Sequence, residues 1–162
     1  TLHLSSAASD VYKRQHLMRL RKFWRGCLNR EQRYALAHRA LEAGIEENAS
    51  GTVILVEGKR DEIALRTLGF SGPIEKLNRG WTVDRVVVYI AEKYGKCIVL
   101  MDWDRTGGRL QRRLMDSMIS LDIKPSDELR RALSKAMKPD TMCVEALTSF
   151  LGHPNSRFLN DV

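Results

Sequence analysis

The chain has 162 residues, of which 43% are hydrophobic and 29% are charged, a composition typical of a globular protein with room for one domain rather than two. No apolar run approaches the roughly 20 residues that a membrane-spanning helix needs, so we expect no membrane partner. The formal net charge of +7 at pH 7 favours an anionic partner such as nucleic acid, because Lys and Arg side chains neutralise phosphates.

Three cysteines lie far apart along the chain. Cys27, Cys97 and Cys143 form no Cys-x-x-Cys pair, so the sequence indicates neither a zinc site nor a disulfide framework. We therefore expect a reducing, cytoplasmic setting. Cys97 falls inside an apolar run and is predicted to be a small core residue rather than a reactive thiol.

The amino-terminal segment has no clear structural pattern. Residues 1–17 are predicted to be a non-native or disordered extension, because Thr1–Gln15 shows neither helical nor strand periodicity and no initiator Met. It also has no apolar stretch typical of a signal peptide, and Met18 is the expected start. Residues 18–50 are expected to form a basic segment and a first helix. The basic residues of that segment are Arg19, Arg21, Lys22 and Arg25.

A helix is predicted over Asn29–Asn48. Asn29 is a good N-cap, and Gln32 lies three residues further on, as in a capping box. One face of this helix carries apolar residues at helical spacing: Tyr34, Ala37, Leu41 and Ile45. After the break at Ser50-Gly51, the β-branched run Thr52–Val56 predicts a strand that is buried on both faces.

The next segments predict a helix, a short strand and a second helix. Lys59–Leu68 is expected to be helical, and Gly69 stops it. Its expected inward residues are Ile63, Ala64, Thr67 and Leu68. A strand follows at Ile74–Leu77. Thr82–Tyr94 combines strand-forming valines with a helical stripe, and its length together with the stop at Gly95 favours helix.

The remainder repeats the same alternation. Cys97–Met101 is predicted to be a second buried strand, and Thr106–Leu121 a helix. The apolar face of that helix is expected to hold Leu110, Leu114, Met118 and Leu121. An edge strand is expected at Asp122–Lys124, then helices at Ser126–Met137 and Thr141–Leu151, and a tail over 152–162.

Alternation of strands and helices predicts an α/β fold. Right-handed crossovers give a mainly parallel sheet of about four strands with helices on both faces, a three-layer, Rossmann-like arrangement. Functional groups are then expected at the carboxyl ends of the strands.

Acidic residues follow both predicted central strands. Glu57 comes directly after the first, and Asp102 and Asp104 come directly after the second. If these strands are neighbours, three carboxylates share a small volume, and their repulsion favours a bound cation. Carboxylate oxygens select Mg²⁺ or Mn²⁺. Basic residues close by in the sequence are predicted to hold nucleic-acid phosphates: Lys59, Arg60, Arg105, Arg109, Arg112 and Arg113.

Each of these residues also has a purely structural interpretation. Asp104 can cap the helix that follows it, and Glu57 can be an ordinary loop carboxylate. Trp103 can pack against the sheet edge or stack on a base. Occurrence of the carboxylates at two strand ends, next to Gly58 and the pair Gly107-Gly108, favours the metal site.

Two segments resemble the signature motifs of Toprim domains. They are Val56-Glu57-Gly58-Lys59-Arg60-Asp61 and Asp102-Trp103-Asp104-Arg105-Thr106-Gly107. The resemblance covers 51–151 and is closest to the small stand-alone Toprim proteins of archaea, which are related to Toprim primases and to the maturase of small ribosomal RNA. It implies a Toprim domain in which Glu57 acts as general acid or base, while Asp102 and Asp104 bind Mg²⁺. The position of Glu57 at the strand end separately predicts that it also contacts the metal.

The resemblance implies magnesium-dependent phosphoryl transfer on RNA or DNA, of a nuclease-like kind used in RNA processing or DNA repair. A non-catalytic Toprim module that binds metal and nucleic acid remains the alternative. A topoisomerase or a complete primase is disfavoured, because the chain has no room for the further domains that those enzymes need. A nucleotide-binding regulator is also disfavoured, since the turn after the first strand lacks a Gly-x-Gly-x-x-Gly pattern.

Overall fold

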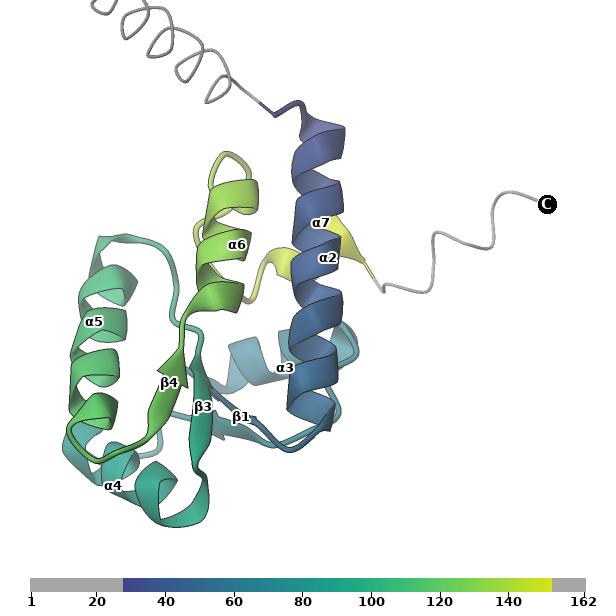
Figure 1. Ribbon diagram of the computed structural model, residues 1–162. Coiled ribbons are helices and arrows are strands. Elements are labelled where there is room, and N and C mark those ends of the chain that lie inside the picture. Colours follow the sequence, from purple (N-terminus) through teal and green to yellow (C-terminus); the bar gives the residue numbers. More distant parts are fainter. Residues whose placement is uncertain (1–27, 153–162) are drawn as a thin grey trace, which may run out of the picture. The chain divides into compact units, whose positions relative to one another are not determined.

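The computed structural model describes residues 28–152 of the chain (Figure 1). It contains two compact units, Thr1–Gln32 and Arg33–Val162, of which the second holds the sheet. The predictions for residues 1–17, for the start at Met18, for the basic run and for the tail beyond 152 lie outside the described residues. Within the described part, no helix is both long and apolar enough to cross a membrane.

Helix α2 spans Arg30–Ala49 and begins at the predicted capping box. The Gln32 amide donates to the side chain of Asn29 at 2.8 Å, and the Asn29 amide donates to the side chain of Gln32 at 3.1 Å. The predicted inward residues Tyr34, Ala37 and Leu41 are buried, and Ile45 is partly buried against the same core.

Four strands form one parallel sheet in the order β2-β1-β3-β4. They are β1 (Val53–Val56), β2 (Ile74–Lys76), β3 (Lys96–Val99) and β4 (Lys124–Ser126). The predicted α/β class with a four-stranded parallel sheet is therefore confirmed. Cys97 is fully buried in β3, as predicted.

The edge strand β4 lies two residues later than predicted. Asp122 adopts a positive φ of 57° and forms the turn before it. Pro125 then aligns with Cys97 of β3, which is compatible with a strand that has only one neighbour, because a proline there need not donate to a second strand. Since Ser126 belongs to β4, the helix that was predicted from that residue begins at Glu128 instead.

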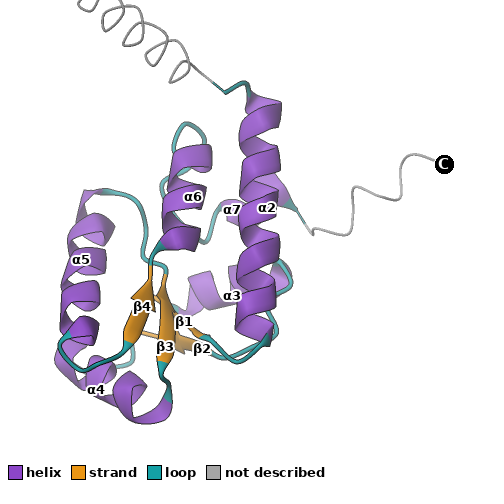
Figure 2. Ribbon diagram, in the orientation of Figure 1, coloured by secondary structure: helices purple, strands orange, loops and turns teal. Residues whose placement is uncertain are grey.

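Within residues 28–152, five more helices accompany the sheet: α3 (Lys59–Thr67), α4 (Val83–Lys93), α5 (Arg105–Ile119), α6 (Glu128–Met137) and α7 (Leu147–Leu151). Two apolar clusters define the layers of the Arg33–Val162 unit. One joins the sheet to α2, α3, α6 and α7, and the other joins it to α4 and α5. Figure 2 shows the strands between these two sets of helices.

Three predicted details of the helices are wrong. On α3, Ile63 is 55% exposed and Thr67 is also exposed, while Asp61 and Leu65 turn inward. Leu121 is exposed because α5 ends at Ile119.

The last helix begins at Leu147, not at Thr141. The Thr141 hydroxyl accepts a hydrogen bond from the Cys143 amide at 3.2 Å, and such local side-chain bonds compete with helix formation. The chain therefore makes turns between α6 and α7 before the helix can start.

Asn48 is a buried polar residue that joins α2 to the start of two strands. Its side-chain amide donates to the carbonyls of Thr52 and Pro73 at 2.9 Å each, and its oxygen accepts from the Gly72 amide at 2.8 Å. Both amide hydrogens and the oxygen of the Asn48 side chain are thus bonded to backbone groups of the segments that lead into β1 and β2.

Glu75 on the edge strand β2 carries a second polar network. Burial opposes its ionisation, but hydrogen bonds from Arg79, Tyr89 and Tyr94 outweigh burial and lower the pKa of the Glu75 carboxyl. The two tyrosine hydroxyls donate at 3.0 and 3.2 Å, and Lys93 adds an ion pair at 3.6 Å. The network fastens α4 to this edge of the sheet.

Candidate functional site

The two strands that precede the acidic residues are neighbours in the sheet. Leu55 of β1 pairs with Val99 of β3, and the Leu100 amide donates to the Leu55 carbonyl at 2.9 Å just beyond the paired region. Parallel neighbours end at the same edge. The fold therefore places Glu57 next to the segment that carries Asp102.

Asp102 is half-buried and held from several directions. Its Oδ1 accepts a hydrogen bond from the Val144 amide at 2.8 Å. Burial, together with the charges of Asp61, Glu57 and Asp104, raises the pKa of Asp102 to about 6, although the Val144 hydrogen bond lowers it. The charges of four carboxylates are thus coupled at this edge of the sheet.

Arg130 of α6 supports the peptides on either side of Asp102. Its Nε donates to the Met101 carbonyl at 2.9 Å, and its Nη2 donates to the Asp102 carbonyl at 2.7 Å. Arg130 could not be identified from the sequence, because it lies 28 positions along the chain from Asp102 and belongs to no motif.

Asp104 caps helix α5. Its Oδ1 accepts a hydrogen bond from the Gly107 amide at 2.6 Å, so the capping interpretation of this residue is confirmed. Capping uses one carboxylate oxygen and leaves the exposed second oxygen without a hydrogen-bond partner in the described residues. A structural role and a role as ligand are therefore compatible.

Asp61 is a fourth carboxylate at this edge of the sheet, and it was not among the predicted site residues although it belongs to the first Toprim-like motif. It is 8% exposed, its Oδ2 accepts from the Gly58 amide at 2.9 Å, and burial raises the pKa of its carboxyl. Its place three residues after Gly58 at the start of α3 is the signal that identifies it as a capping residue. It holds the turn that carries Glu57.

The chemistry of these donors fits a hard divalent cation. Asp102 and Asp104 are each oriented by one hydrogen bond at Oδ1, which leaves the Oδ2 atoms for another partner. In residues 28–152, however, no three His, Cys, Asp or Glu side chains are already gathered as a metal site. Joint binding of one ion by Glu57, Asp102 and Asp104 would therefore require side-chain rotation, and it stays a prediction.

Trp103, between the two aspartates, is a packing residue. It is 5% exposed, lies in the same apolar cluster as α6 and α7, and donates its indole N–H to the Thr141 carbonyl at 2.6 Å. The packing interpretation is thus confirmed, because no open ring face is left for a base.

No family model matches the chain. A UPF0292 protein from Pyrococcus abyssi is 34% identical over 126 residues, which are 77% of this chain and 94% of that protein. This chain belongs to the UPF0292 family. A second UPF0292 protein, from Pyrococcus furiosus, is 39% identical over 95 residues, or 59% of this chain and 70% of that one.

A solved structure resembles the fold of this UPF0292 protein. A protein from Aquifex aeolicus superposes with a TM-score of 0.56 and 25% sequence identity, covering 66% of this chain and 94% of that chain. The same arrangement of sheet and helices therefore occurs in a second protein whose structure has been solved.

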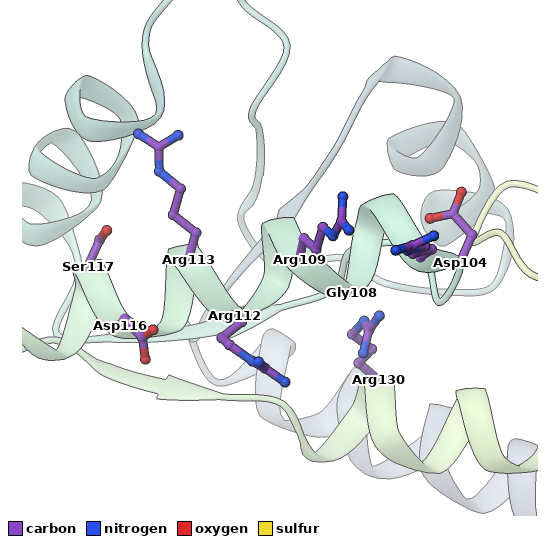
Figure 3. Close-up of a pocket in the computed structure, with 9 residues that line it drawn as sticks. Asp104, Gly108, Arg109, Arg112, Arg113, Asp116, Ser117 and Arg130 are labelled. Carbon is purple, nitrogen blue, oxygen red and sulfur yellow. The ribbon is translucent and has the colours of Figure 1, made fainter.

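The predicted basic residues of this UPF0292 protein separate into two groups. Those on α5 line a pocket that begins at Asp104 (Figure 3). Lys59 and Arg60 lie in the first turn of α3, which packs on the other face of the sheet, and they do not line that pocket. Arg60 instead approaches Glu145 at 3.9 Å, an exposed pair that contributes little stability.

Proposed function

We propose that this UPF0292 protein is a Toprim-type domain that catalyses magnesium-dependent phosphoryl transfer on nucleic acid, most simply cleavage of an RNA or DNA phosphodiester. The observation that carries the proposal is the adjacency of β1 and β3, which brings Glu57 to the same edge of the sheet as Asp102 and Asp104. The coupled charge at Asp102 and the basic surface that begins at Asp104 support it.

The three acidic residues of the site have different roles in this proposal. Asp102 and Asp104 would hold Mg²⁺ or Mn²⁺ through their Oδ2 atoms, since Oδ1 of each accepts a backbone hydrogen bond. A bound magnesium ion would supply charge neutralisation for the scissile phosphate. Glu57, which follows β1 and keeps a partly exposed side chain, would move the proton in the reaction.

The activity is tested with labelled single-stranded and structured RNA and DNA in the presence of Mg²⁺. We expect cleavage that disappears in Glu57→Gln while binding of the same oligonucleotides is retained. Glu92→Gln is the matched control, because Glu92 is an exposed carboxylate on α4 with no role in the site. Equal cleavage by Glu57→Gln and by the control would refute the catalytic role of Glu57.

Metal binding is tested separately by titration of Mn²⁺ at fixed salt. Asp102→Asn and Asp104→Asn remove charge but keep an oxygen that can accept the hydrogen bonds from Val144 and Gly107, so the fold should be preserved. We expect the double variant to lose Mn²⁺ binding. Unchanged affinity would exclude these carboxylates as ligands.

A non-catalytic module that binds metal and nucleic acid is the second candidate. The observation that favours it is that Asp104, a proposed ligand, also serves the fold as the cap of α5. Loss of Mn²⁺ binding in the double variant, together with no cleavage of any RNA or DNA probe, would select this alternative. Both cysteines in the described residues are free, which supports our proposal that the protein works in a reducing compartment such as the cytoplasm.

A further inference from the structure

A basic pocket lies on the solvent side of α5, next to the first residues of α6. Its volume is about 700 Å³, and its charged lining residues are Asp104, Asp116, Arg105, Arg109, Arg112, Arg113 and Arg130. Five arginines therefore face two aspartates. Figure 3 shows Arg112 and Arg130 on the side of α5 that faces α6, with Arg109 and Arg113 on the other side.

Most of this positive charge is not neutralised by the protein. Arg113 pairs with Asp84 at 3.5 Å, in a contact in which both side chains are exposed. Arg105, Arg109 and Arg112 are exposed and form no ion pair with any other described residue. Exposed cations gathered in this way attract anions, and phosphates in particular, to which arginine binds with two parallel hydrogen bonds.

Arg130 connects this pocket to the carboxylate edge. Two of its five N–H groups donate to the carbonyls of Met101 and Asp102, and the remaining donors are available for a ligand. Gly108 leaves space beside the Arg130 guanidinium, since the nearest atom to a Cβ added at Gly108 would be Arg130 Nη2 at 3.7 Å. One end of the pocket is thus fixed against the segment that carries Asp102.

We propose that this pocket is a metal-independent subsite for the phosphate backbone of a nucleic-acid strand, which runs along α5 away from the carboxylate edge. The proposal rests on the proposed function, because it places the scissile phosphate of the same strand at that edge. From Arg105 to Arg112 the helix rises about 10 Å at 1.5 Å per residue. That length matches about three phosphate steps of 3.4 Å along a stacked strand.

The lining of the pocket also defines what is recognised. It contains no aromatic residue, and Trp103 nearby is buried, so the pocket offers no aromatic ring on which bases can stack. Contacts with phosphates position a strand but carry no sequence information. We therefore expect binding that depends on strand length and salt and not on base composition.

The test measures binding of labelled oligothymidylates and mixed-sequence oligonucleotides in EDTA, where no divalent metal is present. Affinity should rise with oligonucleotide length until about four phosphates occupy the subsite. The slope of log K against log salt should be about −2 to −3, as expected for three to four neutralised phosphates of a single strand. Combined Arg105→Gln, Arg109→Gln and Arg112→Gln should weaken binding about tenfold or more and reduce the slope by about 2.

A variant with the same loss of charge elsewhere is the matched control. Arg39→Gln, Lys135→Gln and Lys138→Gln lie outside the pocket at exposed positions and should change affinity much less. Thermal unfolding of both triple variants checks that the fold is intact. An equal loss of affinity in the two triple variants would overturn the proposal, because it would show a response to net charge alone.

Competition with inorganic tripolyphosphate distinguishes a strand subsite from a general anion trap. We expect tripolyphosphate to compete more weakly than an oligonucleotide of equal charge, and equal competition would contradict the proposal. Failure of the proposed function looks different, since it would abolish cleavage and Mn²⁺ binding but leave binding in EDTA intact. Failure of the subsite would leave the Mn²⁺ titration unchanged but remove the effect of the arginine substitutions.

Discussion

Two adjacent glycines at the start of α5 provide a direct test of the site geometry. A Cβ added at Gly107 would lie 2.1 Å from the Asp102 carbonyl oxygen, whereas a Cβ added at Gly108 would lie 3.7 Å from the end of the Arg130 side chain. The first distance is far inside van der Waals contact with backbone. Gly107→Ala must therefore move the Asp102 peptide or the first turn of α5 by about 1 Å.

The expected loss of stability is estimated by comparing the free energies of unfolding of the two variants. Each alanine gains about 0.5–1 kcal/mol from its preference for helix over glycine, and this gain cancels because both positions lie in the same turn. Forcing an extra methyl group into a packed position costs about 1–3 kcal/mol. We expect Gly107→Ala to be less stable than Gly108→Ala by that amount, with Gly108→Ala at or slightly above the stability of the original protein.

The assay combines urea denaturation with the Mn²⁺ titration. A change of midpoint without a change of slope would show that Gly107→Ala lowers the stability of an otherwise similar fold. The displaced Asp102 should also reduce Mn²⁺ affinity and any cleavage about tenfold or more, since misplacement by about 1 Å has large effects on reacting groups. Equal stability and equal Mn²⁺ affinity of the two variants would refute the close packing of α5 on the Asp102 peptide.

Three further predictions concern the polar contacts that hold the fold. Asn48→Ala leaves buried backbone groups without partners and should lower the free energy of unfolding by about 2–4 kcal/mol, measured by chemical denaturation, while the exposed Ser50→Ala should change it by less than about 1. Because the folded pKa of Glu75 lies below its unfolded value, its stabilisation is present above about pH 4.5 and is lost as the pH falls through the folded pKa. The stability deficit of Glu75→Gln at pH 7 should thus shrink below pH 4, and a deficit that does not vary with pH would contradict this. Trp103→Phe removes the hydrogen bond to the loop before α7 and should cost about 1 kcal/mol in urea melts, with little change in affinity for oligonucleotides; a large loss of that affinity would contradict the packing role.

The agreement between sequence and structure is greatest where the pattern is local. The capping box at Asn29, the buried strand over Val53–Val56 and the amphipathic helix over Val83–Lys93 depend on hydrogen bonds and periodicity within a few residues. Disagreement arises where a distant contact overrides the local pattern. Ile63 faces solvent because Leu65 and Leu68 pack into the cluster that α3 shares with α2, α6 and α7, which lie far from them in the chain.

The features of the candidate site also fall into those set by local sequence and those set by tertiary contacts. Amino-acid order alone determined that carboxylates follow two buried strands and that arginines recur along one helix, since these are properties of neighbouring residues. Only the tertiary structure decided that β1 and β3 are adjacent, that Arg130 supports the Asp102 peptide, and that the arginines of α5 share a pocket with it. The physical reason is that strand order and helix packing arise from contacts between residues far apart in the chain, on which periodicity carries no information.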